Sequence, residues 1–136
     1  MKKYIVDSDM LIYFLKGKRD AVEILSHIPA EDLYITRINY AELLYGAYNS
    51  QRVEENLKTI KSFLKNFKIL EFTENSSEIF AKLKAKLKKQ GNIIADMDLM
   101  IASIAIDKSF TLITNNKKHF NRIEKLNIYN EKLVEF

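Results

Sequence analysis

Cysteine is absent from this chain of 136 residues, and histidine occurs only twice, as His27 and His119. Without cysteine the protein can form neither a disulfide nor a thiolate metal site. The two histidines lie far apart in the sequence, so a histidine-rich zinc site is not expected either. Any bound metal must therefore be held mainly by oxygen ligands, which favours Mg²⁺ or Mn²⁺.

Long apolar runs are missing as well, because polar residues interrupt the hydrophobic stretches. The sequence therefore predicts no transmembrane helix and no membrane partner. Lys2 and Lys3 precede a short apolar stretch, as in a signal peptide, but Asp7 and Asp9 interrupt that stretch too early for one. A cytoplasmic protein is expected.

The net charge is +4, from 22 basic and 18 acidic residues. If Asp7, Asp9, Glu42, Asp96 and Asp98 share one pocket, the rest of the chain carries 22 − 13 = +9. An acidic pocket on a basic body suits a polyanionic substrate that must also meet a metal. The alternative is a lysine-rich composition with solvated charged faces and no such function.

Repeats, linkers and low-complexity segments do not appear, and 47% of the residues are hydrophobic. This predicts a single globular domain over residues 1–136. Short apolar runs alternate with helical segments, which is typical of an α/β protein with a parallel sheet covered on both faces. Strands are expected at residues 3–6, 33–36, 68–72, 111–114 and 127–129.

Three residues indicate helix boundaries. Pro29 ends a helix that contains residues 21–28, because proline supplies no backbone donor. Thr36 is expected to cap a helix from residue 37 to about residue 48. Gly91 follows a lysine-rich helix end, where glycine commonly stops a helix.

Polar side chains follow the first apolar run of the chain, which Asp7, Ser8 and Asp9 close. In open α/β sheets, chemistry collects outside the carboxyl ends of the strands. Carboxylates in such an apolar setting indicate a divalent-metal site.

A later strand ends in the same way, with Thr114, Asn115 and Asn116. These residues favour an Asx-type turn without any function. His119, which follows them, is expected to pack beside Phe120 rather than bind a ligand. The two polar strand ends nevertheless fall at the same predicted edge of one sheet, and this joint placement favours a site there.

Glu42 lies on a predicted helix whose apolar residues cover most of the circumference. On a helical wheel the remaining polar strip contains Asn39, Glu42, Gly46 and Asn49. A helix this apolar is expected to be largely buried. Glu42 therefore faces either a thin strip of solvent or a polar pocket, and the pattern leaves both open.

Two acids, Asp96 and Asp98, precede an almost wholly apolar stretch that predicts a buried central helix over residues 93–106. Residues two apart in a helix point in nearly opposite directions. Both acids can reach one site only if Asp96 is the N-cap and Asp98 lies in the first turn. Ordinary helix-start chemistry, in which acids are favoured anyway, is the simpler explanation, and it accounts for one acid better than for two.

Four segments together resemble the motifs of PIN domains. Residues 5–12 (IVDSDMLI) are similar to the first motif, and residues 36–46 (TRINYAELLYG) to the second, with its pattern T-x5-E-L-x2-G. Residues 96–102 (DMDLMIA) resemble the third motif, D-x-D-x2-I-A, and residues 112–120 resemble the fourth. The resemblance covers essentially the whole chain, and length and motifs are most similar to the VapC toxins of type II toxin–antitoxin pairs.

The resemblance implies a PIN-like three-layer α/β/α fold with a central, mainly parallel sheet of about five strands. It also implies a metal-dependent endoribonuclease that hydrolyses RNA phosphodiester bonds with carboxylate-bound Mg²⁺ or Mn²⁺. Carried over onto this sequence, the catalytic acids are Asp7, Glu42 and Asp98. The implied metal ligands are Asp7, Glu42, Asp96, Asp98 and Asn116, with Ser8, Asp9 and Thr114 as supporting polar residues. The amide at position 116 removes one charge, which argues against a tightly held second metal.

The implied partners are an RNA substrate, a cognate VapB-type antitoxin and a second copy of the chain in a homodimer. Basic residues at the rim are expected to engage the RNA backbone, namely Arg37, Lys117 and Lys118. Part of the apolar side of the helix at residues 37–48 is expected to form an interface, with Tyr40, Leu44 and Tyr48.

Two other functions fit parts of the sequence. Asp7-Ser8-Asp9 at a strand end also resembles the aspartyl nucleophile and acid of haloacid-dehalogenase phosphatases. That reading leaves Glu42 and Asn116 without a role. The other alternative is a non-catalytic domain that binds RNA or a protein partner.

Overall fold

The computed structural model describes residues 2–130. Its helices and strands alternate along the chain in the order β1 (Tyr4–Val6), α1 (Ser8–Leu15), α2 (Arg19–Ser26), the 3₁₀ turn η1 (Ala30–Asp32), β2 (Leu33–Thr36), α3 (Arg37–Tyr48), α4 (Val53–Leu64), β3 (Lys68–Leu70), α5 (Glu74–Lys89), α6 (Asp96–Lys108), β4 (Thr111–Ile113) and α7 (Lys117–Phe120).

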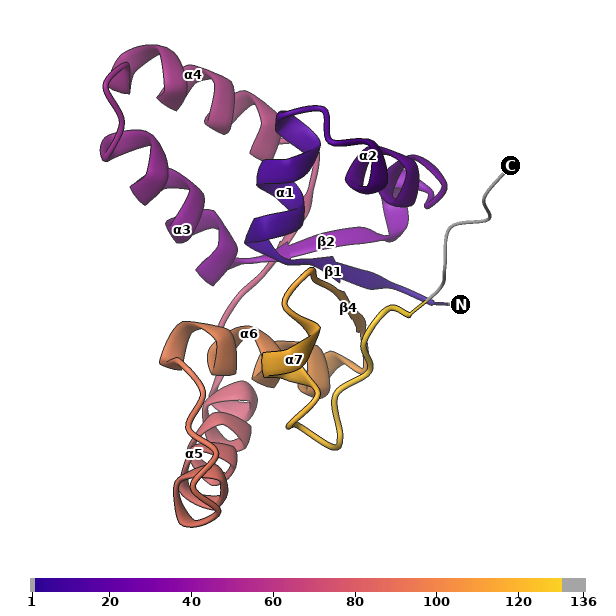
Figure 1. The fold of residues 1–136 in the computed structure, drawn as a ribbon, viewed down its shortest axis with the longest axis vertical. Coiled ribbons are helices and arrows are strands. Elements are labelled where there is room, and N and C mark those ends of the chain that lie inside the picture. The colour runs from indigo at the N-terminus through magenta and orange to yellow at the C-terminus, as the bar shows by residue number, and fades with distance from the viewer. Residues whose placement is uncertain (1, 131–136) are drawn as a thin grey trace.

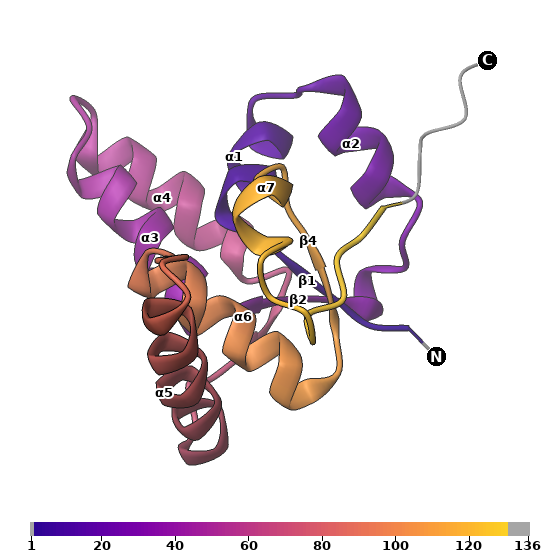
Figure 2. The same ribbon diagram turned by 60° about the horizontal axis from the view of Figure 1, so that its bottom comes forward.

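The four strands form one sheet in the order β3-β2-β1-β4, and every neighbouring pair is parallel. Helices cover both faces, so the predicted α/β/α layering is confirmed (Figure 1). In Figures 1 and 2, α5 and α6 lie on the side of the sheet away from α1 and α2. Parallel pairing brings the carboxyl ends of all four strands to one edge.

Two apolar cores lie on the two faces of the sheet because the strand side chains alternate. Ile5 of β1 and Leu112 of β4 belong to the core under α5 and α6. The next residues, Val6 and Ile113, belong to the core under α1 to α4. All four side chains are at most 1% exposed, so both faces of β1 and β4 are buried, although β4 is the last strand of the sheet.

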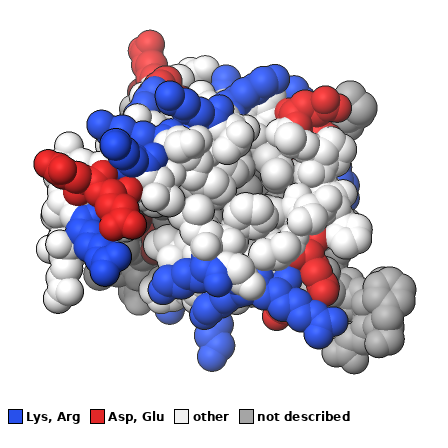
Figure 3. Space-filling view, turned by 90° about the horizontal axis from the view of Figure 1, so that it is seen from above, with Lys and Arg blue, Asp and Glu red and all other residues white. Residues whose placement is uncertain are grey.

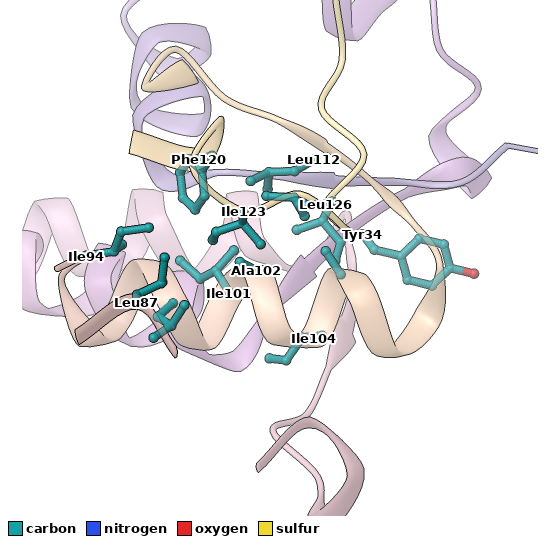
Figure 4. Packing of buried hydrophobic residues seen from close by; sticks show 13 residues of the cluster. Tyr34, Leu87, Ile94, Ile101, Ala102, Ile104, Leu112, Phe120, Ile123 and Leu126 are labelled. Atoms are coloured by element: carbon teal, nitrogen blue, oxygen red, sulfur yellow. The ribbon is translucent and has the colours of Figure 1, made fainter. Parts of the chain in front are cut away.

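The core under α5 and α6 depends on the chain after β4. Figure 4 shows Phe120 and Ile123 pointing toward Ile101 and Ala102 of α6. Phe120 is fully buried. The short helix α7 is therefore anchored by its last residue, while its first residues stay at the surface near the carboxyl edge of the sheet.

The last predicted strand, at residues 127–129, is present only as a single parallel bridge between Leu112 and Ile128. The amide of Leu112 donates to the carbonyl of Asn127, and that of Tyr129 donates to the carbonyl of Leu112, both at 2.8 Å. The sheet thus has four strands instead of about five within the described residues. β3 is also shorter than predicted and ends at Leu70.

The helix that precedes Pro29 is shifted from its predicted position, and α2 ends at Ser26 rather than reaching residue 28. The predicted burial of α3 is only partly correct, because Tyr45 and Tyr48 are 68% and 60% exposed. No helix in residues 2–130 is long and apolar enough to cross a membrane.

Helix starts place two residues of the candidate site. Thr36 caps α3 as predicted, and its hydroxyl accepts from the amide of Asn39 in a capping box. The condition under which both Asp96 and Asp98 could reach one site is not met, because Ala95 is the N-cap of α6 and Asp96 is its first helical residue. Asp96 and Asp98 are therefore both inside the helix and project to different sides.

Candidate active site

The candidate site lies at the carboxyl edge of the sheet, where β1 and β4 end side by side. The amide of Asp7 donates to the carbonyl of Ile113 at 2.9 Å, which continues the pairing by one residue. α1 begins directly after Asp7 and α3 directly after Thr36. The fold thus brings the first turns of two helices to the end of the central strands.

Asp7 is buried, with 6% of its surface exposed. Its Oδ2 accepts from the hydroxyl of Thr114 at 2.7 Å, and its Oδ1 accepts from the amide of Ser8 at 2.9 Å. The amide nitrogen of Asn39 lies 3.4 Å from Oδ1. All of these donors are neutral, so no positive charge in the described chain compensates this carboxylate by direct contact.

Glu42 reaches the same place from α3. Its Oε1 accepts from the hydroxyl of Ser8 at 2.7 Å, and the Ser8 oxygen accepts in turn from Asn39 Nδ2 at 3.0 Å. Of the two possibilities that the sequence left open, Glu42 therefore faces a polar pocket. Ser8 connects the carboxylates of the first and second motifs through hydrogen bonds to both.

Asp9 and Asp98 complete the group. The carboxylate of Asp9 accepts from the amides of Met10 at 2.7 Å and Asn115 at 3.1 Å. The side chain of Asp98, in the first turn of α6, is 24% exposed, and its Oδ2 lies 4.0 Å from Nδ1 of His119. His119 thus faces the site instead of only packing beside Phe120.

Burial raises the pKa of all four carboxyl groups. The pKa of Asp7 rises from 3.8 to about 7, first through burial and then through repulsion from Asp9, although hydrogen bonds from Thr114 and Ser8 oppose the rise. Burial likewise raises the pKa of Asp9, against the amides of Met10 and Asn115. For Glu42 and Asp98 burial is again the largest cause of a raised pKa; Ser8 opposes it at Glu42 and His119 opposes it at Asp98.

The donor set fits a hard divalent cation in its chemistry, because it consists of carboxylate oxygens without thiolate. Within residues 2–130, however, no three His, Asp or Glu side chains are oriented so that together they could hold a metal ion. The side chains of Glu42 and Asp9 are engaged by neutral donors instead. The carboxyl groups nevertheless lie close enough to repel one another, and a cation at this edge would relieve that repulsion.

Two residues predicted to bind metal are not brought into the group by any contact. Asp96 is half-exposed and pairs with Lys84, whose Nζ lies 3.0 Å from Oδ1 and 3.2 Å from Oδ2. Asn116 precedes α7, and its backbone amide donates to Thr114 Oγ1 at 3.0 Å. Thr114 thus joins the fourth motif to Asp7 through its hydroxyl rather than through the side chain of Asn116.

The basic residues expected at the rim differ in availability. Arg37 forms a two-pronged ion pair with Glu71, at 2.9 and 2.6 Å, so its guanidinium is already engaged. Lys117 and Lys118 are exposed at the start of α7. Figure 3, which looks onto the side of α1, α2 and α4, shows basic side chains in separate groups around a broad area without charge.

Asn39 is the site residue that the sequence analysis did not single out. It is fully buried, forms the capping box with Thr36, and donates to Ser8 and toward Asp7. Its position in the sequence could have indicated this role, because Asn39 lies three residues before Glu42 on the same narrow polar strip of an otherwise apolar helix.

Comparison with protein families gives a match over most of the chain. Residues 4–126 match the PIN domain family. Among curated proteins, Ribonuclease VapC2 of Haemophilus influenzae is 36% identical over 132 residues, which is 96% of this chain and 98% of that protein. The tRNA(fMet)-specific endonuclease VapC of Shigella flexneri is 28% identical, covering 90% of this chain and 93% of that protein.

Solved structures agree with this match. A chain in the crystal structure of VapBC2 from Rickettsia felis, bound to a DNA fragment from their promoter, superposes with a TM-score of 0.86 at 32% identity, covering 95% of this chain and 98% of that chain. A chain of the DNA-bound VapBC from Salmonella typhimurium gives a TM-score of 0.87 at 26% identity with the same coverage.

Proposed function

This chain belongs to the PIN-domain family, and from that premise we propose that it is an endoribonuclease, the toxin of a VapBC-type toxin–antitoxin pair. The observation that carries the proposal is the group of four carboxyls, Asp7, Asp9, Glu42 and Asp98, at the carboxyl edge of a parallel sheet. A group of buried and half-buried carboxyls without a bonded lysine or arginine in residues 2–130 suits a site that receives a divalent metal and a phosphodiester.

We assign metal binding to Asp7, Glu42 and Asp98, with Asp9 as the fourth acid within reach. A bound Mg²⁺ or Mn²⁺ would supply an activated water and neutralise charge on the attacked phosphate. Glu42 could bind such an ion through its second oxygen, because only Oε1 accepts the hydrogen bond from Ser8. Neither Asp96 nor Asn116 has a contact that supports a role as metal ligand.

The residues around the acids position them. Thr114 and the amide of Ser8 hold the two oxygens of Asp7, so its carboxylate plane is fixed before any ligand arrives. Asn39 holds Ser8, and Ser8 holds Oε1 of Glu42, which leaves Oε2 without a hydrogen-bond partner among residues 2–130 and able to accept a proton from a water. Such outer contacts commonly tune metal affinity.

An antitoxin is the second partner, and an apolar groove next to the acids suits it. The groove, of about 370 Å³, lies between α1, α3 and α4 and is lined by Ile12, Leu15, Ala47 and Ile60, with Glu42 at its margin. The similar chains in solved structures come from VapBC complexes. An antitoxin segment seated here could place a basic side chain on the carboxylates and block metal.

A homodimer is also proposed, and the exposed tyrosines of α3 suit an interface. Tyr48 is 60% exposed and Tyr45 is 68% exposed, whereas Tyr40 and Leu44 are half-buried. The RNA substrate and the antitoxin would be met in the cytoplasm.

The haloacid-dehalogenase alternative is less well supported. That chemistry uses a free aspartyl oxygen as nucleophile, whereas both oxygens of Asp7 accept hydrogen bonds from its own surroundings. Among residues 2–130, no lysine contacts Asp7 or Asp9.

The test is RNA cleavage by the purified chain, separated from its antitoxin, with Mn²⁺ or Mg²⁺ and with EDTA. Cleavage with metal and none with EDTA is expected, and Asp98→Asn should abolish it in a folded protein. Expression alone should arrest growth, and the antitoxin gene should relieve the arrest. Full activity of Asp98→Asn, or metal-independent cleavage, contradicts the assignment, and phosphatase activity with trapping of Asp7 would favour the alternative.

A further inference from the structure

A second cavity lies directly behind Thr114, on the other side from the carboxylates. Its volume is about 480 Å³, within the range of small-ligand sites. It is formed by α1, the start of α2, the end of β4 and the start of α7, with Tyr129 closing one side. Figure 2 shows α7 beside α1 in this part of the molecule, with α2 close by.

The charge of this cavity is opposite to that of the acidic group. Lys18, Arg19 and Lys117 line it together with a single acid, Asp20, which gives a balance of 3 − 1 = +2. Arg19 is paired with Glu23 at 3.0 Å. Lys18 and Lys117 have no carboxylate partner within residues 2–130.

Lys18 is also held in place. Its ammonium lies 4.1 Å from the ring centroid of Tyr13, another lining residue, and its backbone amide donates to the carbonyl of Tyr13 at 2.9 Å. A cation–π contact of this kind restricts the side chain while leaving the charge uncompensated. The ammonium is therefore directed by the fold and is available to an anion.

The wall between the two sites is thin and consists of residues that serve both. Thr114 donates to Asp7 on one side, and its neighbour Asn115 donates through its amide to Asp9. Thr114 and Asn115 also line the basic cavity, as does Met10, whose amide binds Asp9. Met10, Thr114 and Asn115 therefore border both sites, so an RNA strand with one phosphate at the carboxylates could extend toward this cavity.

We propose that this cavity is a subsite for the nucleotide next to the cleaved bond, with Lys18 and Lys117 binding its phosphodiester group. The proposal rests on the proposed ribonuclease function. The acids and their metal would act on one phosphate, and the two lysines would fix the register of the strand by holding the neighbouring one. Both lysines are positioning residues, and neither takes part in bond cleavage.

The test measures binding separately from cleavage. The cleavage site of a single-stranded RNA oligonucleotide is first mapped with the wild-type chain and Mn²⁺. Affinity for the same fluorescein-labelled RNA is then measured in EDTA by anisotropy over a range of salt. The double variant Lys18→Glu/Lys117→Glu is compared with Lys82→Glu/Lys86→Glu, which makes the same charge change on exposed lysines of α5, on the far side of the sheet.

The cavity variant should bind more weakly than the α5 variant, and its plot of log K against log salt should be shallower by about 0.7 for each lysine lost. Replacing single phosphates by neutral methylphosphonate localises the effect. Neutralising one phosphate adjacent to the cleaved bond should weaken wild-type binding and leave the cavity variant unchanged. The milder variant Lys18→Gln/Lys117→Gln should have an unchanged melting curve. It should lose less RNA affinity than the wild-type chain when that same phosphate is neutralised.

Equal affinities of the cavity and α5 variants, or equal sensitivity to neutralisation at every phosphate, overturn the subsite. Unchanged RNA binding with lost inhibition by the antitoxin also overturns it and assigns the cavity to an acidic protein segment. If the wild-type chain neither binds nor cleaves RNA, the ribonuclease function fails and the subsite with it. If it cleaves RNA normally while the cavity variant matches the control, only the subsite fails.

Discussion

Asp98 and Asp96 lie two residues apart in the first turn of α6, yet their surroundings are opposite. Asp98 turns inward to a group of buried and half-buried carboxylates, where partial burial raises its pKa. Asp96 turns outward, is half-exposed, and pairs with the ammonium of Lys84 at 3.0 Å. The helical periodicity alone separates the two side chains, because residues two apart project in nearly opposite directions.

The same division holds for the rest of this edge. Outside the pocket, Glu71 has its own cation, and the Arg37 guanidinium lowers the pKa of that carboxyl. Inside the pocket, Asp7 and Glu42 have only neutral donors. The comparison teaches that Asp96 and Glu71 are already paired with cations, whereas Asp7 and Glu42 contact only neutral groups of the described chain and would gain from an external cation when ionised.

The largest expected difference between the two regions is in catalysis. Asp7→Asn should lower the rate of metal-dependent RNA cleavage by about 10²–10³-fold or more, because it removes a charged metal ligand at the reacting centre. Asp96→Asn, the matched control, should change the rate by less than about threefold, because its carboxylate interacts with an exposed lysine. Initial rates on one RNA substrate measure both, and equal losses in the two variants would contradict the division.

The next difference concerns stability against pH in the metal-free protein. The pKa of Asp7 is about 7 in the folded state against 3.8 in the reference state. The folded state therefore binds more protons over this interval, so stability falls as pH rises from about 4 to about 7 and levels off above it. At 1.36 kcal/mol per pKa unit, Asp7 accounts for about 4 kcal/mol.

Asp7→Asn should remove most of this slope and raise the melting temperature in EDTA near pH 8, roughly by 5–10 °C. Mn²⁺ should stabilise the wild-type protein, since it binds only the folded state, and stabilise the variant less. Thermal melts between about pH 4 and 8 with Asp96→Asn as control measure this. A wild-type protein that becomes more stable between pH 5 and 7 without metal would contradict the electrostatic account.

The sequence predicts this pocket only in part, and helical geometry explains what it misses. Asp7 and Thr114 could be placed together because parallel strands bring their carboxyl ends to one edge. The N-cap of α6 could not be placed, because an acid is favoured both at the cap and in the first turn. The sequence therefore predicted Asp96 as a residue of the pocket, whereas in the structure its carboxylate lies outside the pocket and pairs with Lys84.

Packing between segments that are distant in the sequence explains the other differences between the predictions and the structure. Glu42 faces the pocket because Ser8, 34 residues earlier, offers it a hydroxyl, and no local pattern contains that information. The last predicted strand is limited to one bridge at Ile128, and the chain between α7 and that bridge places Ile123 and Leu126 in the core under α6. Tyr45 and Tyr48 contribute to the apolar pattern of α3 but are exposed, so the pattern predicted more burial for this helix than the structure has.

A smaller effect is expected from the neutral donors of the pocket. Thr114→Val removes the hydroxyl that donates to Asp7 and accepts from the amide of Asn116. We expect the pKa of Asp7 to rise further and the affinity for Mn²⁺ to fall by about 10–100-fold, as for other outer contacts of metal sites. Calorimetric titration of Mn²⁺ measures this, and Thr114→Ser, which keeps the hydroxyl, should retain affinity. Equal affinity of the Val and Ser variants would remove Thr114 from the account.

The smallest effect should come from the exposed pairs. Lys84→Ala removes the cation beside Asp96, and both side chains are about half-exposed. Solvent and salt screen such a pair, so we expect less than about 1 kcal/mol of lost stability and no change in RNA cleavage. Urea denaturation and initial rates at low and high salt measure the two quantities.

A fall in cleavage comparable to that of Asp7→Asn would mean that Asp96 leaves Lys84 and joins the metal site during the reaction. In that case Lys84→Ala should also alter Mn²⁺ affinity, and Asp96→Asn should abolish the alteration. If neither measurement moves, the boundary between the two regions of α6 runs between residues 96 and 98.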